Sequence, residues 1–125
     1  MKDDRVYLDH ILECIRRIEE DVRPGRDVFM ASHTLQDAVL RNLHTLAEST
    51  QRLSVGLQLA NPEVEWRRIA AFRNVVVHDY LGVDLDRIWH ITQSEVPALK
   101  PTIQAILRNL PDLPDVDEEA NEEDD

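Results

Sequence analysis

The 125-residue sequence is poor in glycine, cysteine and aromatic side chains. It contains 3 glycines, 1 cysteine (Cys14) and two each of Trp, Tyr and Phe. A single cysteine excludes an intramolecular disulfide and fits a reducing compartment. So few aromatic residues provide no stacking platform of the kind that binds single-stranded nucleic acid. The scarcity of glycine, together with many Leu, Ile, Ala, Glu and Arg residues, favours helix.

The sequence also lacks a long apolar run. No stretch approaches the roughly 20 apolar residues that span a bilayer, and Met1–Arg5 lacks the apolar core of a signal peptide. We therefore expect a cytoplasmic protein that does not associate with membranes. At this length the chain is expected to form one domain, which buries about two-thirds of its unfolded surface.

Basic residues are missing from the C-terminal stretch. The net charge is −11, but nine of the 25 acidic residues follow Leu110, where no Lys or Arg occurs. The rest of the chain has 16 acidic and 14 basic side chains and is nearly neutral. We therefore expect a helical domain over residues 1–110 and an acidic disordered tail over residues 111–125.

Apolar residues recur at three- and four-residue spacing along the domain, which predicts an all-α fold, an antiparallel bundle of four to five helices. Pro24-Gly25 separates the first two helices, and Asn61-Pro62 is typical of a helix start. Asp84 is a plausible cap, and Pro97 and Pro101 begin or kink the last helix. The expected helices span about residues 4–21, 27–58, 61–82, 84–92 and 97–110, with Gly82 as the plausible stop of the third.

The third expected helix ends in a group of chemically capable side chains. Asn74 and His78 are four residues apart and share a face, so Asn74 can orient the imidazole. Arg73 aligns with Tyr80 rather than with His78, from which an ideal helix separates it by about 140°. Arg73 and His78 converge only if the helix loosens near His78 or if their side chains wrap around its end. The β-branched run Val75–Val77 weakens the helix there.

This set of side chains suits cleavage of RNA without a metal. Arginine clamps phosphate oxygens with a planar fork, histidine moves protons near neutral pH, and the 2′-hydroxyl of RNA is an internal nucleophile. No carboxylate cluster suggests a magnesium site, and we expect neither a metal nor a cofactor. Taken alone, the spacing favours a structural reading: a buried arginine and a histidine that caps the end of a helix.

Positive charge for binding RNA is expected from Arg41, Arg67 and Arg68, although the last two are equally typical of a solvated helix face. An arginine at position 73 needs a partner, because it lies next to an apolar stripe. Glu13, Asp37 and Glu48 are the candidates, and Asp37 is favoured because its helix also carries Arg41.

The remaining candidates have simpler interpretations. His10 and Cys14 are four residues apart, a spacing that can bind metal, but a packing pair is favoured because two ligands do not make a site. Trp66 and Trp89 are expected to anchor the core. Three isolated histidines are expected at the surface or in packing: His33, His44 and His90.

Arg73, His78 and Tyr80, separated by four residues and then by one, match the motif of the HEPN superfamily, and the sequence resembles its HepT-like branch. The likeness covers about residues 4–110. One departure is Ala47-Glu48-Ser49, where the family usually shows Gly-Glu-Ala, so the acidic residue is kept. The segments that carry the likeness are Tyr7–Glu13, Gln36–Leu43, Phe72–Asn74 and Val83–Asp84, together with Pro62, Trp66, Ile69 and Ile88-Trp89.

The resemblance implies the toxin of a type VII-like toxin–antitoxin system, a homodimeric endoribonuclease without a metal whose two motifs face each other across the dimer. His78 would be the general acid or base for attack of the 2′-hydroxyl. Arg73 would hold the scissile phosphate, and Asn74 would orient His78 or bind phosphate. The cognate antitoxin would resemble a minimal nucleotidyltransferase that adds AMP to Tyr80.

Two other hypotheses stay open. The chain could be a non-catalytic helical module that binds nucleotide or docks the nucleotidyltransferase, or the transferase could be the toxin and this chain its antidote. The intact pair of Arg73 and His78 favours catalysis. Dimerisation is supported by a third helix that is apolar on more than one side, although a central helix of a monomer core would have the same pattern.

Overall fold

The computed structural model describes residues 3–75 and 84–111, and this part of the chain is helical without any strand. The predicted all-α class is confirmed. His78, Tyr80 and the predicted acidic tail lie outside the described residues. The elements are α1 (Asp4–Val22), α2 (Arg26–Ala31), α3 (His33–Gln51), α4 (Val55–Ala60), α5 (Trp66–Ala70), the 3₁₀ turn η1 (Ala71–Asn74), α6 (Leu85–His90), the π-helical turn η3 (Ile91–Glu95) and α7 (Val96–Asn109).

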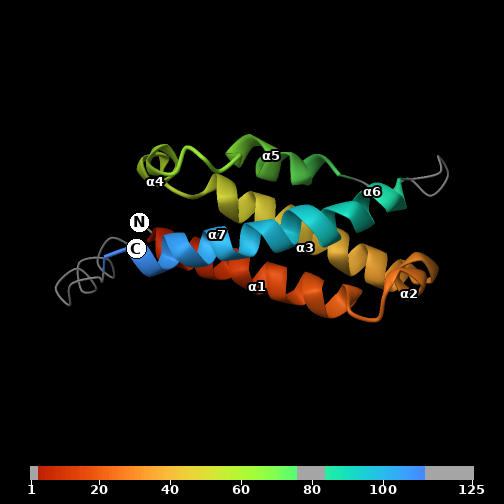
Figure 1. Ribbon diagram of the computed structural model, residues 1–125. Helices are drawn as coiled ribbons and strands as arrows, with labels where there is room; N and C mark the ends of the chain where they lie inside the picture. Colours follow the sequence, from red (N-terminus) through yellow and green to blue (C-terminus); the bar gives the residue numbers. More distant parts are fainter. Residues whose placement is uncertain (1–2, 76–83, 112–125) are drawn as a thin grey trace, which may run out of the picture.

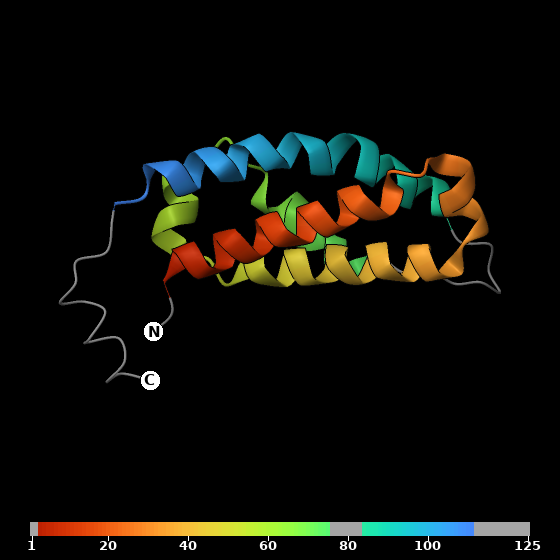
Figure 2. The same cartoon turned by 90° about the horizontal axis from the view of Figure 1, so that it is seen from below.

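The helices form an up-and-down bundle (Figure 1). α1 packs against α3 and α7, while α5 and η1 pack on the outer side of α3. In Figure 2 the long helices α7, α1 and α3 run along the bundle, and the short helices α2 and α4 lie at its opposite ends. The start of α1 meets the end of α7, where the Arg5 guanidinium donates a hydrogen bond to the carbonyl of Pro111 (2.7 Å).

Aliphatic side chains from α1, α3 and α7 fill the core. Ile11, Leu43 and Ile103 are completely buried, as the three- and four-residue spacing predicts. Both tryptophans pack against this core as expected. Trp89 lies beside Phe29, with ring centroids 5.4 Å apart. The Trp66 indole donates to the carbonyl of Asn61 (3.1 Å), so its polar edge is satisfied.

The second expected helix, residues 27–58, is wrong as a single element and is three helices. Ser32 and Ser54 interrupt it, and both have extended backbone conformations. Each serine hydroxyl accepts a hydrogen bond from the amide three residues later, at 3.2 Å, and so caps α3 and α4 respectively. The apolar stripe runs through both breaks, so the spacing alone did not reveal them. The local cause is serine capping, which competes with helix continuation.

The third expected helix, residues 61–82, begins later than predicted. Asn61 ends α4 rather than starting a helix, because its side-chain amide donates to the carbonyl of Leu57 (2.9 Å). Helix α5 begins only at Trp66, tightens into η1 at Ala71 and ends at Asn74. The chain is already extended at Val75, with φ −75° and ψ 123°. The described helix therefore ends at Asn74, and the expected relation of Arg73 to His78 involves a residue outside the described part of the chain.

The last two expected helices are one continuous rod with a π turn. Asp84 caps it as predicted, with Oδ1 accepting from the amide of Arg87 (3.0 Å). Pro97 begins α7 and Pro101 lies inside it. Pro97 has no N–H for the carbonyl of Gln93 and its ring crowds that carbonyl, so the helix widens to π geometry just before it. Among the described helices none is long and apolar enough to cross a membrane.

Candidate functional site

The turn η1 points Arg73 at the end of α3. Its Nη1 donates to Gln51 Oε1 at 2.5 Å, and its Nε lies 3.7 Å from Glu48 Oε2. The arginine side chain is 49% exposed, so it is not buried in the core. The prediction that favoured Asp37 as its partner is wrong. Asp37 lies about 16 Å from Glu48 along the axis of α3, toward the start of the helix. Glu48, another of the three candidates, is the observed partner.

Glu48 is shared between two arginines. Its Oε1 lies 3.4 Å from Arg52 Nη2, one turn along α3, while its other oxygen faces Arg73. Two guanidinium groups around one carboxylate leave a net charge of +1. All three side chains are about half exposed, so the pairs contribute little to stability. The cluster instead maintains a local positive surface on a chain whose net charge is −11.

Arg73 keeps donors for a further ligand. A guanidinium carries five N–H groups in one plane, and the contacts with Gln51 and Glu48 use its Nη1 and Nε. Within residues 3–75 and 84–111 no partner occupies Nη2. The outer edge of the fork can therefore bind two oxygens of a phosphate. Asn74 is exposed beside it at the end of η1.

The chain that leaves η1 is also held by α3. His44 Nε2 lies 2.6 Å from the carbonyl oxygen of Val75. His44, Glu48 and Gln51 are spaced by four and three residues and share one face of α3, which we call the α3 polar stripe. The contacts of His44 and Gln51 with the motif segment were not predicted from the sequence. Their signal is the spacing of polar residues on the helix that precedes the motif.

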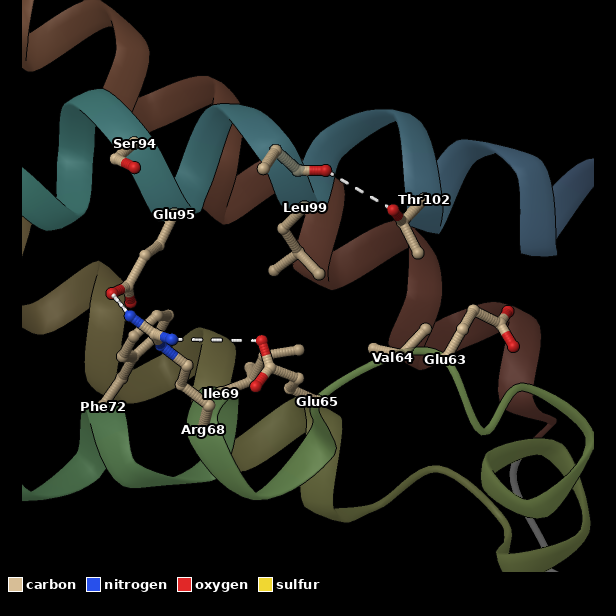
Figure 3. A pocket seen from close by; sticks show the side chains of 11 residues that line it. Glu63, Val64, Glu65, Arg68, Ile69, Phe72, Ser94, Glu95, Leu99 and Thr102 are labelled. Carbon is tan, nitrogen blue, oxygen red and sulfur yellow. Dashed lines mark hydrogen bonds and ion pairs between the residues drawn. The ribbon is translucent and has the colours of Figure 1, made fainter.

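A different surface lies on the other side of α5. A cavity of about 400 Å³ opens between α5 and α7 (Figure 3). Its apolar floor includes Ile69, Phe72 and Leu99. Its charged residues are Glu63, Glu65, Glu95 and Arg68. We call this cavity the acidic groove, and Arg73 is not among its lining residues.

Arg68 is engaged within the acidic groove. Its Nη2 donates to Glu95 Oε1 at 2.6 Å, and its Nη1 lies 3.9 Å from Glu65. The hydrogen bond to Glu95 raises the pKa of Arg68, with smaller contributions from the charges of both glutamates. Glu63 adds a third carboxylate to the lining. Three carboxylates against one guanidinium make this surface unfavourable for a phosphate chain.

The other predicted RNA-binding arginines remain accessible. Arg41 is exposed on α3, seven residues before Glu48 and hence on the same face. Arg67 is exposed on α5. Arg41, Arg73 and Asn74 therefore lie on or next to α3. Arg68 lies on the side of α5 that faces α7.

His10 and Cys14 do not face a common ligand. Cys14 is 2% exposed in the core, where burial raises the pKa of its thiol. His10 is exposed, and its Nδ1 lies 2.8 Å from Ser49 Oγ of α3. No group of three or more His, Cys, Asp or Glu side chains in the described part of the chain could hold a metal ion.

The sequence matches known proteins over most of the helical domain. A family model described as "Ribonuclease HepT-like" matches residues 11–106. The chain is 33% identical over 95 residues to a "Probable ribonuclease HepT" from Thermococcus cleftensis, which covers 75% of this chain and 86% of that protein. It is 32% identical over 109 residues to a "Putative RNase" from Caldanaerobacter subterraneus subsp. tengcongensis, with 86% and 97% covered.

A third relative is a longer protein. The "Gamma-glutamylcyclotransferase and putative RNase" from Methanocaldococcus jannaschii is 34% identical over 110 residues, or 87% of this chain. The chain spans half the length of that relative. No solved structure matches this chain. The family model covers most of the chain, and the relatives align along nearly all of the helical domain. The chain therefore belongs to the ribonuclease HepT-like family of the HEPN superfamily.

Proposed function

We propose that this chain is the toxin of a type VII-like toxin–antitoxin system, a homodimeric endoribonuclease of the cytoplasm that needs no metal. One observation carries the proposal. Arg73 is half exposed, held by Gln51 and Glu48, and part of a cluster with net positive charge. An arginine that only stabilised the fold would have no need of accessible donors. Membership of the ribonuclease HepT-like family supports the same activity.

The proposed chemistry uses the RNA as its own nucleophile. The 2′-oxygen forms a bond to phosphorus while the bond from phosphorus to the 5′-oxygen breaks. The products are a 2′,3′-cyclic phosphate and a 5′-hydroxyl. Arg73 holds the phosphate and stabilises the charge that develops on its oxygens. His78 takes the proton of the 2′-hydroxyl or delivers one to the leaving oxygen, and Asn74 orients His78 or binds phosphate.

The test is cleavage of RNA by the purified protein, with and without EDTA. His78→Ala and Arg73→Ala should each abolish most of the activity, and EDTA should not. Arg108→Ala is a control for loss of a positive charge, because Arg108 is exposed near the end of α7. Cleavage by both motif variants at the wild-type rate would contradict the proposal. Sedimentation of the active protein as a monomer would remove the dimer from it.

Tyr80 is proposed as the site at which the cognate nucleotidyltransferase adds AMP. A bulky anion two residues from His78 would compete with RNA for the positive cluster around Arg73. Mass spectrometry of the protein made with and without the transferase encoded beside it tests this. A mass increase in AMP steps that disappears in Tyr80→Phe is expected, and an increase retained in Tyr80→Phe would place the modification elsewhere.

Two of the accessible arginines are proposed to contact RNA. Arg41 lies on the face of α3 that carries the Arg73 cluster, and Arg67 is exposed on α5. Arg68 already pairs with two carboxylates, so we expect it to contribute least.

A non-catalytic role is the second candidate. Arg73 has two partners on α3, which also fits an arginine that orders a docking surface for the nucleotidyltransferase. Expression of each gene alone, scored for growth arrest, separates the two functions. Arrest caused by the transferase and relieved by this chain would make this chain the antidote.

A further inference from the structure

One hydrogen bond joins α3 to the chain at the exit of η1. His44 Nε2 lies 2.6 Å from the carbonyl oxygen of Val75, across 31 positions of sequence. A carbonyl oxygen can only accept, so Nε2 must carry the hydrogen and His44 is the donor. The contact therefore requires a hydrogen on Nε2, which in the neutral imidazole corresponds to the Nε2–H tautomer.

Val75 is fixed at three points. Its amide donates to the carbonyl of Phe72 (3.2 Å), its side chain is 5% exposed, and its carbonyl accepts from His44. A carbonyl at the end of a helix has no hydrogen-bond partner within that helix. His44 supplies a donor for the Val75 carbonyl. The direction of the backbone as it leaves Val75 is thereby set, three residues before His78.

The same helix face holds the arginine of the motif. Gln51 and Glu48 contact the Arg73 side chain, and His44 holds the backbone after it, all within about 10 Å along α3. One helix thus holds both the Arg73 side chain and the backbone of Val75. We propose that His44 is a positioning residue for the active site, which it serves through the Val75 carbonyl. This inference rests on the proposed ribonuclease function.

The expected effect lies on turnover rather than on binding. A displacement of about 1 Å in an active site can cost up to about 10²-fold in rate. His44→Ala should lower the single-turnover rate at saturating RNA by about 10-fold or more, with RNA affinity nearly unchanged. His44→Gln should restore most of the rate, because the glutamine amide can donate from nearly the position of Nε2. His44→Asn should not, because its amide is one carbon shorter.

The experiment compares these three variants with wild type and with His33→Ala. His33 is an exposed histidine at the start of the same helix, so its loss should change neither rate nor affinity. Melting temperatures of all variants are measured beside the rates. Wild-type cleavage by His44→Ala overturns the inference. So does a loss of rate that follows only the unfolded fraction, or one that glutamine fails to rescue in a folded protein.

Two readouts do not depend on activity. The side-chain nitrogen spectrum of His44 should show the Nε2–H tautomer, and amide hydrogen exchange at residues 73–75 should be faster in His44→Ala but not in His33→Ala. If wild type cleaves no RNA, the proposed function fails, and these readouts still decide whether His44 holds Val75. If cleavage depends on Arg73 and His78 but not on His44, only the present inference fails.

Discussion

The two sides of the α5–η1 segment differ in charge and in depth. Toward α3, Arg73 and Arg52 share Glu48 on an open surface with a net charge of +1. Toward α7, Arg68 lies in the acidic groove with an excess of carboxylates. Phe72, which lines the groove, is directly followed in the sequence by Arg73, which faces α3. A single helical step therefore separates two surfaces with opposite electrostatic preference.

The cavity and the candidate phosphate-binding residues therefore lie on different surfaces of this protein. A cavity between helices is the ordinary first hypothesis for a binding site. Here the residues that suit a polyanion lie on a shallow surface, and the cavity repels phosphate. The proposed binding of RNA along α3 rests on this difference in charge, which four predictions test.

The largest effect is expected where the two sides are joined. Phe72 is 4% exposed and lines the groove immediately before Arg73. Phe72→Ala should lower the free energy of unfolding by about 3–5 kcal/mol, because it leaves a cavity, and should also displace Arg73. Urea denaturation measures this, with Leu59→Ala as control because Leu59 is 74% exposed. Equal stability of the two variants would show that Phe72 does not support both surfaces.

Replacing the arginine by lysine tests the positive side alone. Arg73→Lys keeps the charge and loses the planar fork, so the single-turnover rate of RNA cleavage should fall by about 10²-fold. The melting temperature should change little, because exposed ion pairs contribute at most about 1 kcal/mol. Arg108→Lys serves as the matched control. An unchanged rate in Arg73→Lys would mean that charge alone suffices at this position.

Removing one arginine from each side compares them directly. Arg52 and Arg68 are 60% and 58% exposed, so they are matched in accessibility. In a His78→Ala background, Arg52→Ala should weaken RNA binding several-fold and lower the salt slope by about 0.7 if it removes one phosphate contact. Arg68→Ala should change neither. A larger loss from Arg68→Ala would assign RNA to the acidic groove.

The smallest effect is expected on α1, where an ion-pair cluster lies apart from both surfaces. Hydrogen bonds from Arg16, and then from Arg17, lower the pKa of Glu13 from 4.5 to about 2. The cluster therefore stabilises the fold above about pH 4.5, and this contribution is lost as the pH falls toward 2. Glu13→Gln should lower the melting temperature slightly at pH 7, and should flatten its decline below pH 4.5 by a similarly small amount.

The control for that experiment is Asp9→Asn, because Asp9 is exposed on the same helix. It should decline with pH as wild type does. If the melting temperature of Glu13→Gln also declines like that of wild type, exposed ion pairs contribute no measurable stability here. The cluster at Glu48 would then matter only for its local positive charge.

Much of the fold could be predicted because apolar spacing is a direct consequence of packing. The spacing placed α1 within one residue of each end, and Asp84 was identified as a cap from its residue type. The breaks at Ser32 and Ser54 could not be predicted in the same way. Serine is tolerated inside helices, and only its hydrogen bond to an amide three residues later shows that it caps one.

The surroundings of Arg73 could be predicted only in part. Arg73 was expected to need a partner, which is correct, whereas the loosening expected near His78 lies outside the described residues. The choice of Asp37 over Glu48 was wrong, because sequence shows which face a residue shares but not the height at which two helices meet. His44 was undetectable as an anchor, since its partner is a backbone carbonyl.

The hydrogen bond between Arg5 and Pro111 joins the two ends of the described bundle. Domain ends that lie so close together suit circular permutation. A short linker could join the two ends, and new ends could be opened in the turn after Asn61, where Pro62 and Glu63 are exposed. In such a permutant α5 would begin the chain and α4 would end it. The α5–η1 segment could then detach from α3 while α1, α3 and α7 stay packed together.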